Sequence, residues 1–187
     1  FSVPTGNFGN VFSGYAARRG GLNVDQLVVG SNTNDILTRF FESGTMRIDE
    51  VVPTTSPSMD IQVSSNFERL LFELLDREGA KVDEMLKRFR KEKEISISPN
   101  LHQELGKEWS GARFVDDQVK RCISEEAENS GILLDPHSAI GVLAGRECRR
   151  NKNIPMVALA TAHPAKFPDA VEDATGVHPK LPSHLKD

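Results

Sequence analysis

The chain has 187 residues, of which 38% are hydrophobic and 27% charged, and its formal net charge is −4. This composition predicts one soluble globular domain; the charge gives no reason to expect nucleic acid or an anionic membrane as partner, and no apolar run could span a bilayer. The two cysteines, Cys122 and Cys148, have neither metal-site nor disulfide spacing, so we expect reduced thiols in a cytoplasmic protein.

The chain opens on a glycine-rich turn. Residues 2–10, SVPTGNFGN, are typical of a strand end, a turn and the start of a helix. The two glycines allow a sharp turn, and either asparagine tolerates unusual φ angles or caps the helix. Free N–H groups at the positive end of a helix favour a phosphate ligand. Because so little precedes the turn in a chain that begins with Phe1, we expect the later part of a longer protein.

Strands and helices alternate after this turn. A helix is predicted over 11–19, a short strand over 26–31, and a second helix with one apolar stripe up to Gly44. This alternation predicts a parallel α/β sheet with crossover helices.

The middle of the chain differs from the first part in composition. Residues 45–65 are rich in Pro, Ser and Thr and predict a polar loop of the kind that lines sites. A helix follows over 66–76, and 81–128 is predicted to be mainly charged helical segments, a helical insertion at about 80–130. The mixed-sign cluster at 88–94 favours a solvated helix face over a nucleic-acid site.

The last third holds two further elements. A helix is expected from Asp135-Pro136 to about Arg149, and 156–160 has the continuous apolar pattern of a strand buried on both faces. Thr161 comes directly after this strand, where α/β sheets place ligands, although it could equally cap the following turn.

Other candidate sites are weaker. Asp135, His137 and Ser138 are the residue types of a hydrolase triad, but near adjacency at a helix start favours helix capping. The five histidines show no paired metal-ligand spacing. Lys166 and Arg69 could each contact an anion, although surface solvation of the lysine and ion pairing of the arginine are the expected alternatives.

Five segments together resemble the threonine synthase family of pyridoxal-phosphate enzymes, which have a tryptophan-synthase-β-like fold. They occur in the family's order and span most of the chain: SVPTGNFGN (2–10), NDILTRFFESG (34–44), TTSPSMDIQVSSNFERLLFE (54–73), LLDPHSAIGV (133–142) and LATAHPAKFPDAV (159–171). The resemblance implies that residues 1–187 form the later part of that fold: a partial parallel sheet with flanking helices, carrying the phosphate-turn half of the cofactor domain.

The resemblance also assigns roles. The turn that holds the phosphate of pyridoxal 5'-phosphate corresponds to Gly6, Asn7, Phe8, Gly9 and Asn10. Thr161 matches the hydroxyl that hydrogen-bonds the pyridine nitrogen, a neutral partner that moderates the electron sink. Asp60, Asn66 and Arg69 are substrate-side candidates. The implied reaction converts O-phospho-L-homoserine and water to L-threonine and phosphate.

One residue of the family's active site has no counterpart in this chain. The family's Schiff-base lysine lies upstream of the phosphate turn, and Lys166 does not match it, so no catalytic lysine is assigned in this chain. We therefore expect the chain to be inactive alone and to need an N-terminal part of the same protein. The alternatives are a threonine-synthase-like phospho-lyase of the same fold and a non-catalytic module that binds a phosphate ligand or a partner.

Overall fold

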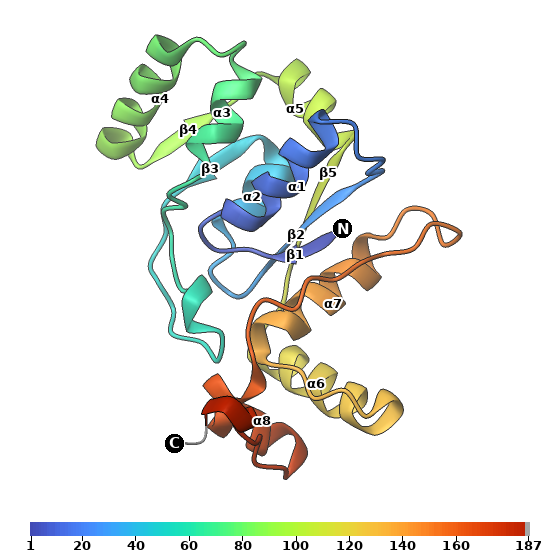
Figure 1. Ribbon diagram of the computed structural model, residues 1–187. Coiled ribbons are helices and arrows are strands. Elements are labelled where there is room, and N and C mark those ends of the chain that lie inside the picture. Colours follow the sequence, from blue (N-terminus) through green and yellow to red (C-terminus); the bar gives the residue numbers. More distant parts are fainter. Residues whose placement is uncertain (186–187) are drawn as a thin grey trace.

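The centre of the fold is a three-stranded parallel sheet, seen in a computed structural model that describes residues 1–185 (Figure 1). Its strands run in the order β1-β2-β5. They are β1 (Ser2–Pro4), β2 (Leu27–Ser31) and β5 (Trp109–Arg113). β2 is fully buried, because it pairs with a strand on each side and helices cover both faces.

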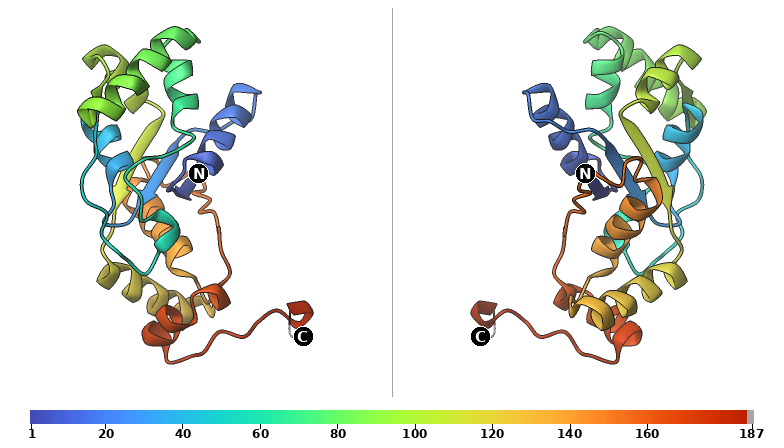
Figure 2. Two further views of the ribbon diagram at one scale, coloured as in Figure 1. Left: turned by 90° about the vertical axis from the view of Figure 1, so that its left-hand side faces the viewer. Right: turned by 90° about the vertical axis from the view of Figure 1, so that its right-hand side faces the viewer.

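Alternate residues of β2 separate two cores. Leu27 and Val29 face a core formed with α1 (Gly9–Arg19) and α2 (Ile36–Ser43), whereas Val28 faces a second core under α7 (Pro136–Cys148). Figure 2 shows the helices on the two faces. The resulting three layers confirm the predicted α/β class with a parallel sheet.

Close contact between α7 and the sheet depends on glycines. A Cβ atom at Gly30 would lie 2.9 Å from Ile140 Cγ2, and one at Gly141 would lie 2.9 Å from Pro4 Cδ. A side chain at either position would push the helix off the strands, so these glycines allow α7 to pack closely against β1 and β2.

A separate two-stranded sheet lies beyond α2. An antiparallel pair joins β3 (Thr45–Arg47) to β4 (Glu94–Ser96), and the buried Met46 and Ile95 extend the first core. Three helices surround the pair: α3 (Glu68–Leu74), α4 (Gly79–Glu92) and α5 (Pro99–Gly106). On the other side of the molecule α6 (Asp116–Ser130) packs against α7 and against α8 (Pro168–Thr175). The remaining turns are the 3₁₀ segments η1 (Pro57–Met59), η2 (Pro164–Lys166) and η3 (Ser183–Leu185).

The structure corrects two sequence predictions. The region 81–128 contains the predicted helices but also β4 and β5, and β5 is a strand of the central sheet. The strand predicted over 156–160 is reduced to one parallel bridge between Ser2 and Ala158, and Val157 is 48% exposed. Among the described residues β1 is the only strand that pairs with this segment, so no strand pairs with its other edge.

The described residues also bear on the predictions about thiols, membrane spans and metal ligands. Cys122 and Cys148 are both free, and burial raises the pKa of each thiol to about 11. Within residues 1–185, no helix is long and apolar enough to cross a membrane, and no three His, Cys, Asp or Glu side chains cluster as metal ligands.

Candidate functional site

The glycine-rich turn lies at the carboxyl end of β1 and leads into α1. The residue with a left-handed backbone is Phe8, with φ 66°, and no asparagine side chain caps the helix. The expectation that Asn7 or Asn10 adopts an unusual φ or caps the helix is therefore wrong. The Phe8 ring is buried in the first core, 5.2 Å from the Phe67 ring and 5.5 Å from the Trp109 ring. Core packing, rather than a tolerant polar residue, therefore sets the turn conformation.

The two glycines of the turn differ. A Cβ atom at Gly6 would lie 2.8 Å from the backbone oxygen of Ser58, whereas one at Gly9 would lie 3.6 Å from Asn66 Nδ2, an ordinary contact. Gly6 is needed because the 54–60 loop packs directly on the turn.

The carbonyl groups of the turn accept hydrogen bonds from other residues, whereas its N–H groups donate none to the described residues. Gly6 O accepts a hydrogen bond from Ser64 Oγ (2.7 Å), and Asn7 O accepts one from Asn66 Nδ2 (2.7 Å) and one from Asn66 N (3.2 Å). The N–H groups of residues 6–10 have no acceptor among the described residues. They lie at the N-terminus of the eleven-residue α1, an arrangement suited to an anion such as a phosphate group.

The 54–60 loop is held by a polar network centred on the half-buried Asp60. Its carboxylate accepts hydrogen bonds from Thr54 Oγ1 (2.7 Å), Asn32 Nδ2 (2.8 Å), Asn34 Nδ2 (3.0 Å) and the Thr54 backbone N–H (2.9 Å). Asn32 also donates to Ser56 Oγ (2.9 Å). Because Asn32 and Asn34 directly follow β2, the network fixes the loop at the same edge of the sheet as the turn.

The three substrate-side candidates lie in different places. Asn66 contacts the turn, and Asp60 lies inside the loop network. Arg69 is exposed on α3, borders a surface hollow with Phe12 and Phe72, and makes no ion pair with any described residue. The structure thus brings Asn66 to the turn but leaves Arg69 on the outer surface, and their substrate roles stay predictions.

The start of α7 is a buried cluster that sequence reasoning identified only as a helix cap. Asp135 is 1% exposed; its carboxylate accepts hydrogen bonds from the His137 backbone N–H (2.9 Å) and from the Ser138 hydroxyl and backbone N–H. The capping role is confirmed. A triad is ruled out by geometry, because Ser138 Oγ bonds Asp135 and His137 Nε2 accepts from the Ser58 backbone N–H (3.3 Å).

The electrostatics of this cluster favour an ionised carboxylate. Burial raises the pKa of Asp135, but hydrogen bonds from His137 and Ser138 outweigh burial and hold the pKa below its ordinary value. His137 Nδ1 lies 3.0 Å from Asp135 Oδ1, so the network assigns the proton to Nδ1 and leaves Nε2 as the acceptor.

Thr161 is joined to this cluster through its backbone. Its N–H donates to Ser138 Oγ (3.2 Å), while its exposed hydroxyl bonds to none of the described residues. Ser2 and Ala158 are paired in parallel, and Thr5 and Thr161 follow them at the same distance along their two segments. Thr161 therefore lies at the edge of the sheet where the turn begins. A single cluster at the start of α7 therefore contacts the Thr161 segment directly and reaches the Gly6 turn through Ser58.

The residues after Thr161 do not join this cluster through their polar groups. The cap of η2 is His163, whose Nδ1 accepts from the Ala165 N–H (3.1 Å), so Thr161 does not cap that turn. Lys166 is exposed, with Nζ 5.9 Å from the centre of the Phe167 ring. The sequence signal for the cluster was present in Asp135-Pro136-His137-Ser138, but spacing alone could not show that it contacts Thr161 and Ser58.

Comparison with known proteins gives one consistent family. A family model described as "Threonine synthase, C-terminal" matches residues 138–187. A threonine synthase of Pseudomonas aeruginosa is 52% identical over 188 residues, which cover 100% of this chain and 40% of that protein.

Two crystal structures agree with this family. PLP-bound threonine synthase from Brucella melitensis has a TM-score of 0.95 and 50% identity over 99% of this chain and 40% of its own. Threonine synthase from yeast has a TM-score of 0.91 and 34% identity over 100% of this chain and 41% of its own. The chain spans about two fifths of the length of these relatives.

Proposed function

Because the chain belongs to the threonine synthase family over the 40% of its relatives' length that it spans, we propose that it supplies the phosphate-binding turn and the Thr161 side of a pyridoxal 5'-phosphate site. The complete protein would be a threonine synthase that converts O-phospho-L-homoserine and water to L-threonine and phosphate. The observation that carries the proposal is the row of N–H groups at residues 6–10 that have no acceptor among the described residues, at the same edge of the sheet as Thr161.

The donor set of the turn suits the cofactor phosphate. Its carbonyl groups are held by Ser64 and Asn66, so they are turned away from the position where an anion would bind. The N–H groups and the positive end of α1 then face the phosphate without competition from an internal acceptor. In this proposal the turn binds the phosphate through its backbone, and Asn66 keeps the turn in that orientation.

Thr161 would hold the far end of the cofactor. Its hydroxyl bonds to none of the residues that the structure describes, and its backbone is fixed by Ser138, so it can hydrogen-bond the pyridine nitrogen as a neutral partner. Bound pyridoxal phosphate supplies stabilisation of negative charge on substrate carbon atoms, and the protein supplies position and proton transfer. The described residues hold no lysine placed beside the turn for a Schiff base, so the proposal assigns that lysine to a preceding part of the protein.

The contacts of Asp60 favour a supporting role. Because four hydrogen bonds occupy its carboxylate, Asp60 would hold the loop in place more readily than it would exchange protons with a substrate. Direct contact of Asp60, Asn66 or Arg69 with O-phospho-L-homoserine remains part of the proposal.

The test uses a full-length protein that contains this chain. We expect bound cofactor with an absorption band near ~420 nm, and release of phosphate from O-phospho-L-homoserine. Thr161→Val should lower phosphate release at least about tenfold, since it removes the hydroxyl but keeps the shape. Thr175→Val, on α8, is the matched control and should leave the rate unchanged.

Two results would contradict the proposal. A full-length protein that binds the cofactor yet leaves O-phospho-L-homoserine intact would favour a related phospho-lyase. Borohydride reduction that traps the cofactor on Lys166 of the 187-residue chain would show that the chain carries its own reactive lysine.

A further inference from the structure

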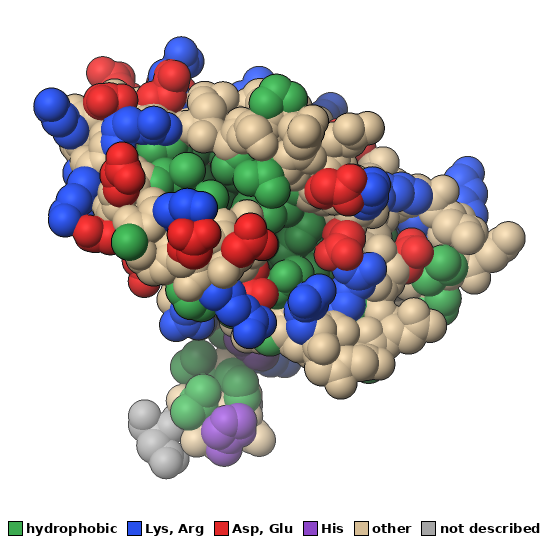
Figure 3. Space-filling view, turned by 90° about the horizontal axis from the view of Figure 1, so that it is seen from above, with side chains coloured by type: hydrophobic (Ala, Val, Ile, Leu, Met, Phe, Trp, Pro, Cys, Tyr) green, Lys and Arg blue, Asp and Glu red, His purple; other side chains and the backbone are tan. Residues whose placement is uncertain are grey.

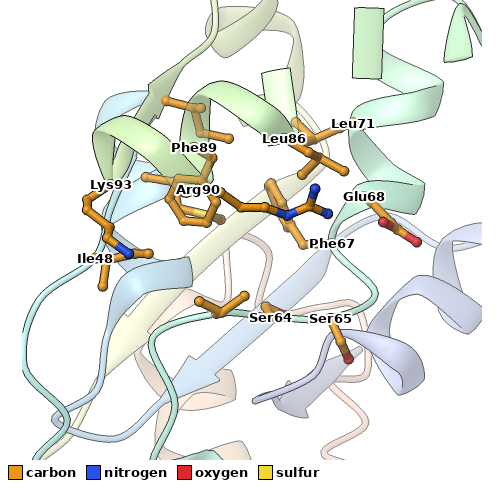
Figure 4. A pocket seen from close by; sticks show the side chains of 13 residues that line it. Ile48, Ser64, Ser65, Phe67, Glu68, Leu71, Leu86, Phe89, Arg90 and Lys93 are labelled. Atoms are coloured by element: carbon orange, nitrogen blue, oxygen red, sulfur yellow. The ribbon is translucent and has the colours of Figure 1, made fainter. Parts of the chain in front are cut away.

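A cavity of about 260 Å³ lies on the opposite side of the Ser64–Ser65 segment from the turn (Figure 4). It is enclosed by α3, α4 and the β3–β4 pair. Its apolar wall comes from five buried side chains: Met46, Phe67, Leu71, Phe89 and Ile95. The volume is below the roughly 300–1,000 Å³ of a drug-sized site, so any ligand is a small molecule.

Charged groups of both signs border this apolar wall. Arg90 comes from the last turn of α4, Lys93 is the residue that follows this helix, and Glu68 comes from the first turn of α3. In Figure 4 the Arg90 guanidinium extends across the cavity towards the Glu68 carboxylate. Neither side chain makes an ion pair or side-chain hydrogen bond with the described residues, although four ion pairs join other charges along α3 and α4.

This combination matches the chemistry of one ligand class. A guanidinium binds a carboxylate through two parallel hydrogen bonds, a carboxylate binds an ammonium group, and the apolar wall accepts a short aliphatic chain. We propose that the cavity binds a free aliphatic L-amino acid, with its carboxylate on Arg90, its ammonium group on Glu68 and its side chain against Leu71 and Ile95.

The position of the cavity gives the bound amino acid a route to the turn. Ser64 and Ser65 form part of the cavity wall, and the same two residues hold the turn through Gly6 O (2.7 Å) and Asn7 Oδ1 (3.2 Å). A ligand that orders this segment therefore stabilises the turn from behind, and the cavity acts as an effector site. The inference requires no cofactor and is independent of the proposed activity.

The first test is a titration of the 187-residue chain with L-leucine, followed by nuclear magnetic resonance. We expect saturable shifts of the Leu71 and Ile95 methyl groups and of the Gly6 amide at millimolar concentration. The absence of saturable shifts up to about 10 mM L-leucine would overturn the proposal, because a specific site of this kind should bind in the millimolar range or tighter.

Two variants and two probes test the placement of the ligand. Arg90→Gln should weaken L-leucine binding at least about tenfold, since it removes the charged partner of the carboxylate. Glu68→Gln should weaken L-leucine but not 4-methylpentanoate, which lacks the ammonium group. Arg88→Gln, an exposed position on the same helix, is the matched control and should leave binding unchanged.

The outcomes separate the proposal from a general anion site. Equal binding of L-leucine by Arg90→Gln and the parent chain would overturn the assignment, as would displacement of L-leucine by millimolar inorganic phosphate. Circular dichroism of each variant confirms that the fold is intact. If methyl shifts occur without a shift of the Gly6 amide, the cavity binds the amino acid but the link to the turn is wrong.

Discussion

Two regions of the molecule differ in the burial and the hydrogen bonding of their polar side chains. At the carboxyl edge of the sheet, Asp135 and Asn32 are almost fully buried and each has several hydrogen-bond partners. Along α3 and α4 the charged side chains lie at the surface, and those that pair do so singly, as Lys87 does with Asp83 (2.6 Å). Figure 3 shows that face, with charged side chains around exposed apolar ones. Buried networks fix one geometry, whereas exposed pairs add little stability.

The largest effect is expected at Asp135. Asp135→Ala removes the cap of α7 and leaves buried N–H and hydroxyl groups without an acceptor, so the free energy of unfolding should fall by about 3 kcal/mol. Urea unfolding followed by circular dichroism measures it. Ser98→Ala, which removes the exposed cap of α5, is the control and should cost about 1 kcal/mol. Equal losses in the two variants would show that burial adds nothing to the cap.

The same carboxylate predicts a dependence on pH. Because its folded pKa lies below the ordinary value of 3.8, its contribution to stability is present above that pH and is lost as the pH falls through the folded pKa. The stability difference between the parent chain and Asp135→Asn should therefore shrink as the pH is lowered from 5 towards the folded pKa. A difference that stays constant over this range would contradict a lowered pKa.

A smaller effect is expected at Gly6. Gly6→Ala forces a Cβ atom against the Ser58 backbone, so the turn or the loop must move, at a cost of about 1–3 kcal/mol. Gly79→Ala is the matched control, because a Cβ atom there meets nothing within 4 Å and should stabilise α4 by up to about 1 kcal/mol. Thermal unfolding of both variants measures the contrast, and a stabilising Gly6→Ala would show that the loop does not press on the turn.

The smallest effect is expected on α4. Lys87→Gln breaks an exposed pair with Asp83, and the free energy of unfolding should change by less than about 0.5 kcal/mol. Measurement at low and high salt provides the control, since any loss should disappear as salt screens the pair. A loss comparable to that of Asp135→Ala would erase the distinction between the two regions.

The sequence predicted the features that depend on local patterns. The apolar stripe of α2, the Pro136 start of α7 and the position of the turn follow from residue spacing and are confirmed. β5 could not be predicted in the same way, because its residues, WSGAR, have little strand preference and gain their structure from pairing with β2. The neighbouring residues favoured a helix, but pairing with β2, which is distant in the chain, makes this segment a strand.

The candidate site shows the same limit. Gly6 and Thr161 were predicted from a motif and a position, but the contacts that join their surroundings pass through Ser58, His137 and Ser138, which lie far from them in the chain. No periodicity encodes such contacts. The left-handed residue was also missed, because a buried aromatic is an unusual occupant of that conformation.

Phe8 has a consequence for any ligand of the turn. Its φ of 66° is unfavourable for an aromatic residue, yet contacts with Phe41, Phe67 and Trp109 hold it in place from within the core. The turn is therefore preorganised, and a phosphate would bind without the entropy cost of ordering it. Trimming the Phe8 ring would keep the N–H groups of residues 6–10 and, on the proposed role of the turn, should still weaken the affinity for a phosphate.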